Sequence, residues 1–458
     1  MNSSGRRGNS HARNASLGDV LPALGEMFLD KAPTSTSATS TNKASTTTAT
    51  TSSTSTKDGS TTSTTTKTTT TILTKGILVT SGSGVIGYRV AMSLLEAGYA
   101  PEKVRVGIYN SSQDRADEGC ALQCAQALRE KGAEVVDFDW TNCEDFDAAL
   151  RGVSLVVCTI PHIQGWQDVF PKFVRKCMYK NVQHFVKISC LKPITGSTTS
   201  SGSGSPTNNA SNNITTNNKT TAHLPNTLSQ LAQLYRERVP YCSFHGQVDD
   251  YLMSVARQNN NGHPMTYTIL GCSHLMTEPL FVQGKFLRQP PHVFATASYG
   301  MGVNYVSPND VADAALVVIL QSQQDDPVVA QQHRHQIYNI TGPGPTTDAH
   351  VASLLSQALG GVDVQHLSLG YNEYVQHLTQ QLHLPAWHVQ HCAAMERMKA
   401  TGAEELATSY TRDYYRLTGK EPQSFRDFLL SKTHPTCMRP GMAFGPKETE
   451  RDMEEKKE

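Results

Sequence analysis

The chain has 458 residues, with 40 Lys and Arg against 40 Asp and Glu, and ten cysteines. A formal net charge of zero gives no overall field favouring nucleic acid or a membrane surface, so we expect neither as a partner. No run reaches the ~18 apolar residues of a membrane span. The cysteines lack C-x-x-C spacing, so we expect reduced thiols, no metal and a cytoplasmic location. Organelle targeting by the Ser-rich N-terminus is the alternative.

Two low-complexity blocks interrupt the chain. Residues 1–73 become almost pure Ser and Thr from residue 33 onward, a composition that cannot bury enough apolar surface to fold. We predict that this region is disordered. A second block at 196–222 is rich in Ser, Thr, Asn and Gly and predicts a surface insertion between two elements of the folded part.

A glycine-rich turn lies at Ser81-Gly82-Ser83-Gly84-Val85-Ile86-Gly87. It follows the apolar run 76–80, which is typical of a strand buried on both faces, and it opens an apolar-periodic helix. Gly82 suits a tight turn, Gly84 lets backbone N–H groups approach a pyrophosphate, and Gly87 lets the helix pack on the strand. The helix dipole favours the phosphate charge. This order of strand, turn and helix predicts a dinucleotide site.

The ends of the next two predicted strands are expected to contact the nucleotide. Tyr109-Asn110-Ser111, at the end of strand 103–109, offers no carboxylate to accept from the ribose 2′-hydroxyl of NAD. NADP(H) is therefore favoured as cofactor, with NAD(H) as the alternative. Asp139 and Trp140 lie at the carboxyl end of the predicted strand 133–139. Asp139 is expected to accept from the adenine amine or, alternatively, to cap the following helix.

Further apolar runs at 153–161 and 182–189 continue a regular alternation of strands and helices. Such alternation predicts an α/β fold with a doubly wound parallel sheet, the Rossmann arrangement, over 74–270. A smaller C-terminal α/β substrate lobe over 271–432 and a charged tail over 433–458 complete the expected organisation.

The order of these segments resembles the NmrA-like branch of the atypical short-chain dehydrogenases/reductases over about 75–432. The resemblance is carried by Val186-Lys187-Ile188-Ser189, His245 to Leu252, Val306 to Ala315, and Tyr415 to Phe428. It implies a bound NAD(P) cofactor. Lys187 is expected to touch the ribose or to point to solvent. The predicted cofactor contacts are Ser81, Gly82, Ser83, Gly84, Val85, Ile86, Gly87, Tyr109, Asn110, Ser111, Asp139, Trp140, Thr159, Ile160, Pro161, Lys187 and Ser189.

The Tyr-x-x-x-Lys pair used by short-chain dehydrogenases is missing from the expected helix. Its spacing occurs only from Tyr99 to Lys103, across a proline in a predicted loop. The expected helix instead carries His245 and Asp249, one turn apart, so that the carboxylate can fix the tautomer of a proton-exchanging imidazole. A structural hydrogen bond by His245 is the alternative.

Two function classes follow from these features. The first is an oxidoreductase that transfers hydride from NAD(P)H to a small carbonyl, quinone or enone-like substrate. The second is a non-catalytic dinucleotide-sensing regulator that binds a partner protein, which the missing Tyr-x-x-x-Lys favours. His388 and His391 lack a third ligand spaced near them, and we assign them to a helix surface rather than to a metal site.

Overall fold

The computed structural model describes nine segments of the chain. They are residues 76–108, 118–140, 145–160, 165–193, 227–257, 264–288, 290–324, 326–406 and 411–431. The predictions of disorder over 1–73, of an insertion over 196–222 and of a charged tail over 433–458 lie outside the described residues. So do the predicted cofactor contacts of Tyr109, Asn110, Ser111 and Pro161.

A seven-stranded parallel sheet forms the centre of the fold, in the order β10-β6-β5-β4-β1-β2-β3. Because β1 lies between β4 and β2, the chain winds outward in both directions from the centre of the sheet, and the predicted doubly wound α/β fold is confirmed. The strands are β1 (Gly76–Val79), β2 (Val104–Ile108), β3 (Glu134–Asp137), β4 (Val153–Cys158), β5 (His184–Cys190), β6 (Thr266–Cys272) and β10 (Gln336–Ile340).

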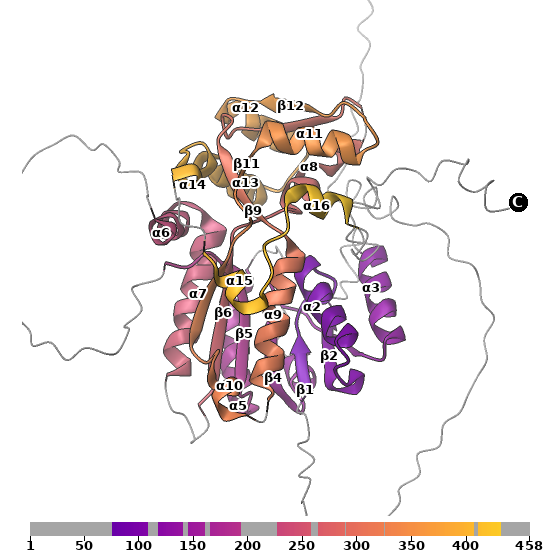
Figure 1. The fold of residues 1–458 in the computed structure, drawn as a ribbon, viewed down its shortest axis with the longest axis vertical. Helices are drawn as coiled ribbons and strands as arrows, with labels where there is room; N and C mark the ends of the chain where they lie inside the picture. The colour runs from indigo at the N-terminus through magenta and orange to yellow at the C-terminus, as the bar shows by residue number, and fades with distance from the viewer. Residues whose placement is uncertain are drawn as a thin grey trace, which may run out of the picture. The chain divides into compact units, whose positions relative to one another are not determined.

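Helices cover both faces of this sheet. One face carries α2 (Val85–Glu96), α3 (Glu118–Glu130), α9 (Pro308–Ser322) and α15 (Asp413–Thr418). The other carries α4 (Asp145–Ala149), α5 (Trp166–Tyr179) and α7 (Pro240–Ala256). Figure 1 shows α2 and α9 side by side against the strands.

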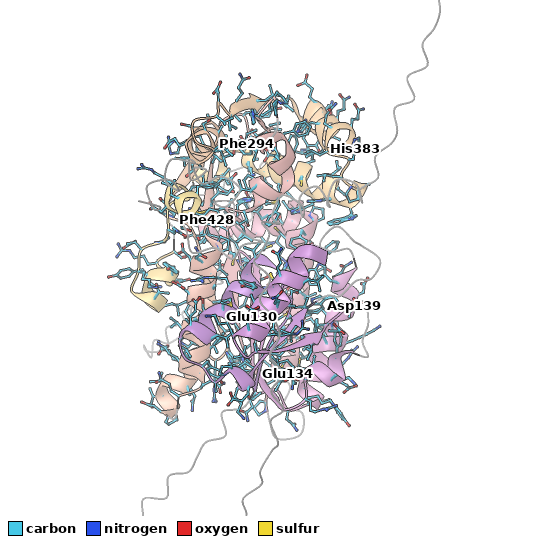
Figure 2. All side chains as sticks on the ribbon, turned by 90° about the vertical axis from the view of Figure 1, so that its right-hand side faces the viewer. Glu130, Glu134, Asp139, Phe294, His383 and Phe428 are labelled. Carbon is cyan, nitrogen blue, oxygen red and sulfur yellow. The ribbon has the colours of Figure 1, made fainter. Side chains whose placement is uncertain are left out.

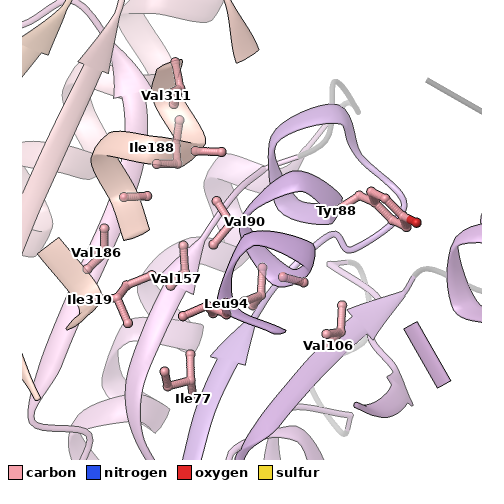
Figure 3. Close-up of a cluster of buried hydrophobic side chains, with 14 of the residues drawn as sticks. Ile77, Tyr88, Val90, Leu94, Val106, Val157, Val186, Ile188, Val311 and Ile319 are labelled. Atoms are coloured by element: carbon pink, nitrogen blue, oxygen red, sulfur yellow. The ribbon is translucent and has the colours of Figure 1, made fainter. Parts of the chain in front are cut away.

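The apolar runs of the strands explain why both faces are covered. Val157 and Val186 are completely buried under Leu94 of α2 and Ile319 of α9, in the cluster that Figure 3 shows. Each fully buried Val, Leu or Ile side chain contributes roughly 1.5–3 kcal/mol relative to an exposed one. The interior of the sheet is therefore held mainly by apolar burial.

Two elements that follow part of the C-terminal lobe in the sequence belong to the central sheet and its helix layer. Both α9 and β10 belong to the sheet layers, although they follow residue 270. The expected boundary between 74–270 and 271–432 thus does not follow the spatial division, because β10 pairs with β6 as the seventh strand. The sequence pattern of one strand cannot show which sheet it joins.

The remaining elements form the lobe beyond the carboxyl ends of the strands. Its sheets are β7 (His274–Leu275), β9 (Gly302–Val306) and β11 (Pro345–Thr347), and β8 (Val293–Thr296) with β12 (Gln365–Ser368). Its helices include α8 (Glu278–Arg288), α11 (Asp348–Ala358), α12 (Tyr371–Gln376), α13 (Ala386–Lys399), α14 (Ala403–Leu406) and α16 (Phe425–Leu430). Figure 2 places Phe294 and Phe428 in this lobe, and Glu130 and Glu134 in the sheet part.

Four further elements lie in the connections between those already named. They are η1 (Pro101–Lys103), α6 (Leu228–Arg238), α10 (Pro327–Gln331) and the single π-turn η2 (His377–Gln381). Within the described segments, no helix combines the length and the apolar character required to cross a membrane.

A buried cluster of polar side chains attaches the lobe to the sheet part. His274 of β7 contacts Glu404 of α14 at 2.8 Å and Tyr235 of α6 at 2.9 Å through Nε2. Tyr235 also donates a hydrogen bond to Glu404, and Glu278 lies 3.5 Å from His274 Nδ1. Burial opposes a charge on His274, but Glu404 and Glu278 outweigh it and raise the pKa of His274 from 6.5 to about 9.

This raised pKa predicts a loss of stability at alkaline pH. The charged form of His274 stabilises the fold fully below pH 6.5, and this contribution is lost as the pH rises through about 9. We expect His274→Gln to lower the unfolding free energy at pH 6 by up to about 3 kcal/mol and to flatten the decline between those pH values. Urea titrations across the range measure both effects. The exposed His350→Gln serves as control, and equal pH slopes in the two variants would contradict this account.

Candidate functional site

The glycine-rich turn joins β1 to α2 at the carboxyl edge of the sheet. Ser81 adopts a left-handed backbone conformation with φ of 52°, and the Gly82 N–H donates to the Gly107 carbonyl at 2.7 Å. Gly84 is the N-cap of α2, where no side chain caps the helix, and the first turn carries no acidic residue. Residues 83–86 are partly exposed. The open N–H groups and the helix dipole therefore suit an anion such as a pyrophosphate.

Two glycines of the turn are required by close packing. A Cβ on Gly82 would lie 2.0 Å from Val106 Cγ1, and a Cβ on Gly87 would lie 2.3 Å from the Ser81 carbonyl oxygen. At Gly84 the nearest atom to such a Cβ is the Ser81 oxygen at 3.1 Å, and the turn leaves its other side open. Gly82 and Gly87 thus bring the turn against the sheet, and Gly84 faces the side from which a ligand can approach.

A buried hydrogen-bond network ties the end of β1 to the end of β4. Thr80 Oγ1 donates to the Thr159 carbonyl at 2.6 Å, and Thr159 Oγ1 donates to the Thr80 carbonyl at 2.5 Å. Ser81 Oγ donates to the same Thr159 carbonyl at 2.9 Å and accepts from Trp140 Nε1 at 3.2 Å. The side chains of Ser81, Thr159 and Trp140 are thus engaged inside the protein, and the backbone N–H and carbonyl of Thr159 are engaged there as well.

The other predicted positions near this edge differ in exposure. Trp140 is 1% exposed and packs edge-on against Phe138 and Phe173, so its ring offers no open stacking surface. Asp139, just beyond β3, and Ile160, just beyond β4, are partly exposed. The structure thus brings the turn and the end of β4 together, and it leaves Asp139 at the rim.

A second cluster lies where β5 meets α7. The Lys187 ammonium, which is completely buried, contacts Asp249 Oδ1 at 2.7 Å, His245 Nδ1 at 2.9 Å and Ser189 Oγ at 3.2 Å. Ser189 Oγ donates to Asp249 Oδ2 at 2.7 Å. The ammonium hydrogen-bonds to His245 and Ser189 and forms an ion pair with Asp249, so the four side chains form one connected unit.

This geometry corrects two sequence-based interpretations. Lys187 does not point to solvent, because its side chain ends inside the sheet–helix layer. Asp249 does not fix the tautomer of His245; it binds Lys187 and Ser189, and Lys187 faces His245 Nδ1 instead. An ammonium can only donate, so Nδ1 accepts and the ring proton is on Nε2.

Aromatic rings and further charges surround the cluster. The His245 ring lies 4.8 Å from that of Trp166 and 4.7 Å from that of Tyr241, centroid to centroid. Lys192, which is buried, lies 3.5 Å from Asp249 Oδ2 and 3.2 Å from Asp250 Oδ1. The side chain of Asp250 is 46% exposed, so the chain of charges extends from Lys187 to the surface.

Sequence reasoning missed the central role of Lys187, although a signal for it was present. A lysine within the apolar run of a buried strand requires a carboxylate partner, because an unpaired buried charge is costly.

The assignment of His391 to a helix surface was wrong: His391 is 7% exposed on α13, and burial lowers its pKa to about 4. Among the described residues, no three His, Cys, Asp or Glu side chains form a metal-binding group.

No protein-family model matches the chain. A curated relative, an uncharacterized oxidoreductase named YesF from Bacillus subtilis (strain 168), is 23% identical over 363 residues, which are 78% of this chain and 94% of the relative.

Solved structures share the fold at low sequence identity. A triphenylmethane reductase from Citrobacter sp. has a TM-score of 0.53 and 17% identity, over 78% of this chain and 98% of the other. An NADPH-dependent quinone oxidoreductase from Escherichia coli has a TM-score of 0.53 and 16% identity, over 77% and 98%. A nucleoside-diphosphate-sugar epimerase from Staphylococcus aureus has a TM-score of 0.52 and 15% identity, over 78% and 100%. The described chain therefore has the α/β fold of these reductases and epimerases.

The buried pair of Lys187 and Asp249 predicts an asymmetric response to mutation. Lys187→Met leaves Asp249 without its closest cation, and we expect a loss of about 3 kcal/mol of unfolding free energy. Lys187→Met combined with Asp249→Leu should recover part of that loss. The matched control is Lys176→Met, which breaks a partly exposed pair with Asp147 and should cost less than about 1 kcal/mol.

Chemical denaturation of the four proteins provides the measurement. The account would be contradicted if Lys187→Met cost no more than Lys176→Met, or if the double variant were less stable than Lys187→Met alone.

Proposed function

We propose that this protein is an NADP(H)-dependent oxidoreductase of the NmrA-like type, in which His245 exchanges a proton with a small carbonyl, quinone or enone-like substrate. The observation that carries the proposal is the buried unit of Lys187, Ser189, His245 and Asp249, next to the carboxyl edge that also carries the glycine turn.

The cofactor would bind at the carboxyl edge where β1 and β4 meet. The helix that follows β1 covers one face of the sheet and the helix that follows β4 covers the other, so the strand order reverses at this edge. The backbone N–H groups of the turn 81–87 would hold the pyrophosphate. Solved structures of this fold include complexes with NADP(H) and NADPH. When bound, the cofactor supplies the hydride.

The proton comes from the chain. His245 donates its Nε2 proton to the substrate oxygen as negative charge develops there, and Nδ1 takes a proton from the Lys187 ammonium. The imidazole then ends neutral in its other tautomer, and Lys187 ends as a neutral amine. Asp249 and Ser189 hold Lys187 in place, while Lys192 and Asp250 connect the unit to the surface for reprotonation. This arrangement replaces the missing Tyr-x-x-x-Lys pair.

The test is turnover by the purified protein. NADPH oxidation is followed by absorbance with a panel of quinones, aldehydes and enones, and cofactor binding is measured by calorimetry. We expect His245→Gln to lower kcat by about 10²–10⁴-fold and to retain NADPH binding. The control is Gln247→Ala, an exposed position on the same helix, which should keep the wild-type rate.

Other outcomes separate the alternatives. Tight binding of the oxidised cofactor without turnover of any acceptor would support the dinucleotide-sensing regulator. Failure to bind any nicotinamide dinucleotide would contradict both functions.

A further inference from the structure

Three free cysteines gather beside the cluster of Lys187 and His245, and the proposed mechanism uses none of them. Cys190 is the last residue of β5 and directly follows Ser189. Cys272 is the last residue of β6 and lies opposite Cys190 in the register of the two strands. Cys242 lies in the first turn of α7, three residues before His245. Two of the three therefore lie within one helical turn of the proposed catalytic groups along the chain.

The contacts single out Cys190 and Cys242 as a pair. Cys242 is 7% exposed and is part of an apolar cluster with Leu231 and Tyr235, against which the partly exposed Cys190 packs. The Cys190 thiol acts as a hydrogen-bond partner of the Cys242 thiol, and together with burial this contact holds the pKa of Cys242 well above its usual value. Cys272 directs its sulfur to the Leu270 carbonyl at 3.6 Å instead.

We propose that Cys190 and Cys242 form a reversible intramolecular disulfide under peroxide stress. The thiol of the more exposed Cys190 releases its proton, and the thiolate attacks the peroxide first: a sulfur–oxygen bond forms, the oxygen–oxygen bond breaks, and the leaving hydroxide takes up a proton to become water. The Cys242 sulfur then attacks the oxidised Cys190 sulfur, and the hydroxyl leaves with the Cys242 proton as a second water. Two thiols lose two electrons in total, and one peroxide is reduced to two waters. The protonated state of Cys242 makes the second step the slower one.

Formation of the disulfide would move the proposed catalytic groups on α7 and β5. A disulfide holds two sulfurs about 2.05 Å apart, much closer than two thiols in contact, so the first turn of α7 must move toward the end of β5. No side chain caps this end of α7, and it is held by packing. His245 and Ser189 are carried by the same two elements. A misplacement of about 1 Å is enough to lower turnover by about 100-fold. This effect on turnover rests on the proposed function, whereas formation of the disulfide does not.

The experiment uses the full chain and hydrogen peroxide. Treated protein is digested without reduction and analysed by mass spectrometry for a cross-linked pair of peptides that contain Cys190 and Cys242. We expect this pair in the wild type and in Cys272→Ser and Cys177→Ala, and its loss in Cys190→Ser and Cys242→Ala. Cys190→Ser changes a partly exposed strand end, so it also covers the case in which Cys242→Ala does not fold. Dithiothreitol should remove the link and restore NADPH oxidation.

The outcomes distinguish the two proposals. Linkage of Cys190 to Cys272, or oxidation of Cys190 without any cross-link in folded protein, would overturn the disulfide. A cross-linked pair in a protein that never oxidises NADPH would support the disulfide and contradict the proposed function. An active enzyme that retains full turnover with the cross-link in place would overturn the regulatory effect.

Discussion

The contact between Lys187 and Asp249 determines how the site is built. It joins the interior strand β5 to α7 through two completely buried charges 2.7 Å apart. Desolvating both charges offsets most of their attraction, so the pair adds little net stability compared with an apolar contact. Its effect is on geometry: the ammonium held by Asp249 also hydrogen-bonds to Ser189 Oγ and His245 Nδ1, and these contacts fix the positions of Ser189 and the His245 ring. The chemistry we propose depends on that fixed arrangement.

The same edge of the sheet carries the second half of the site. The hydrogen bonds between Thr80 and Thr159 hold the ends of β1 and β4 together, and the turn begins at the next residue, Ser81. Since β4 also pairs with β5, the turn and the buried lysine are separated by only one strand. A ligand that extends along this edge can therefore reach from the open N–H groups of α2 to the proton-exchanging unit. The lobe, whose His274 and Glu404 contact Tyr235 of α6, lies beyond that edge (Figure 1).

Much of the fold could be predicted from local sequence patterns. The predicted strand 76–80 corresponds to β1, and Ser307 caps α9 through the Asn309 N–H, as its place before a proline suggests. Asp310, three residues after the cap Ser307, has the spacing of a capping box, but its carboxylate accepts from the Gln423 N–H. The partner is more than a hundred residues away, and no local spacing reveals it. For the same reason the sequence showed that His245 and Asp249 share a helix face but not that Lys187 lies between them.

The proposed chemistry depends on Lys187 holding His245 with its proton on Nε2. Nitrogen-15 NMR of histidine-labelled protein reports the position of this proton, with His245→Gln used to assign the signal. We expect that near neutral pH Nε2 of His245 carries the proton and Nδ1 is a hydrogen-bond acceptor, and that Lys187→Met shifts the Nδ1 resonance. A proton on Nδ1 in the wild type, or a Nδ1 resonance that is unchanged in Lys187→Met, would show that Lys187 does not orient the ring.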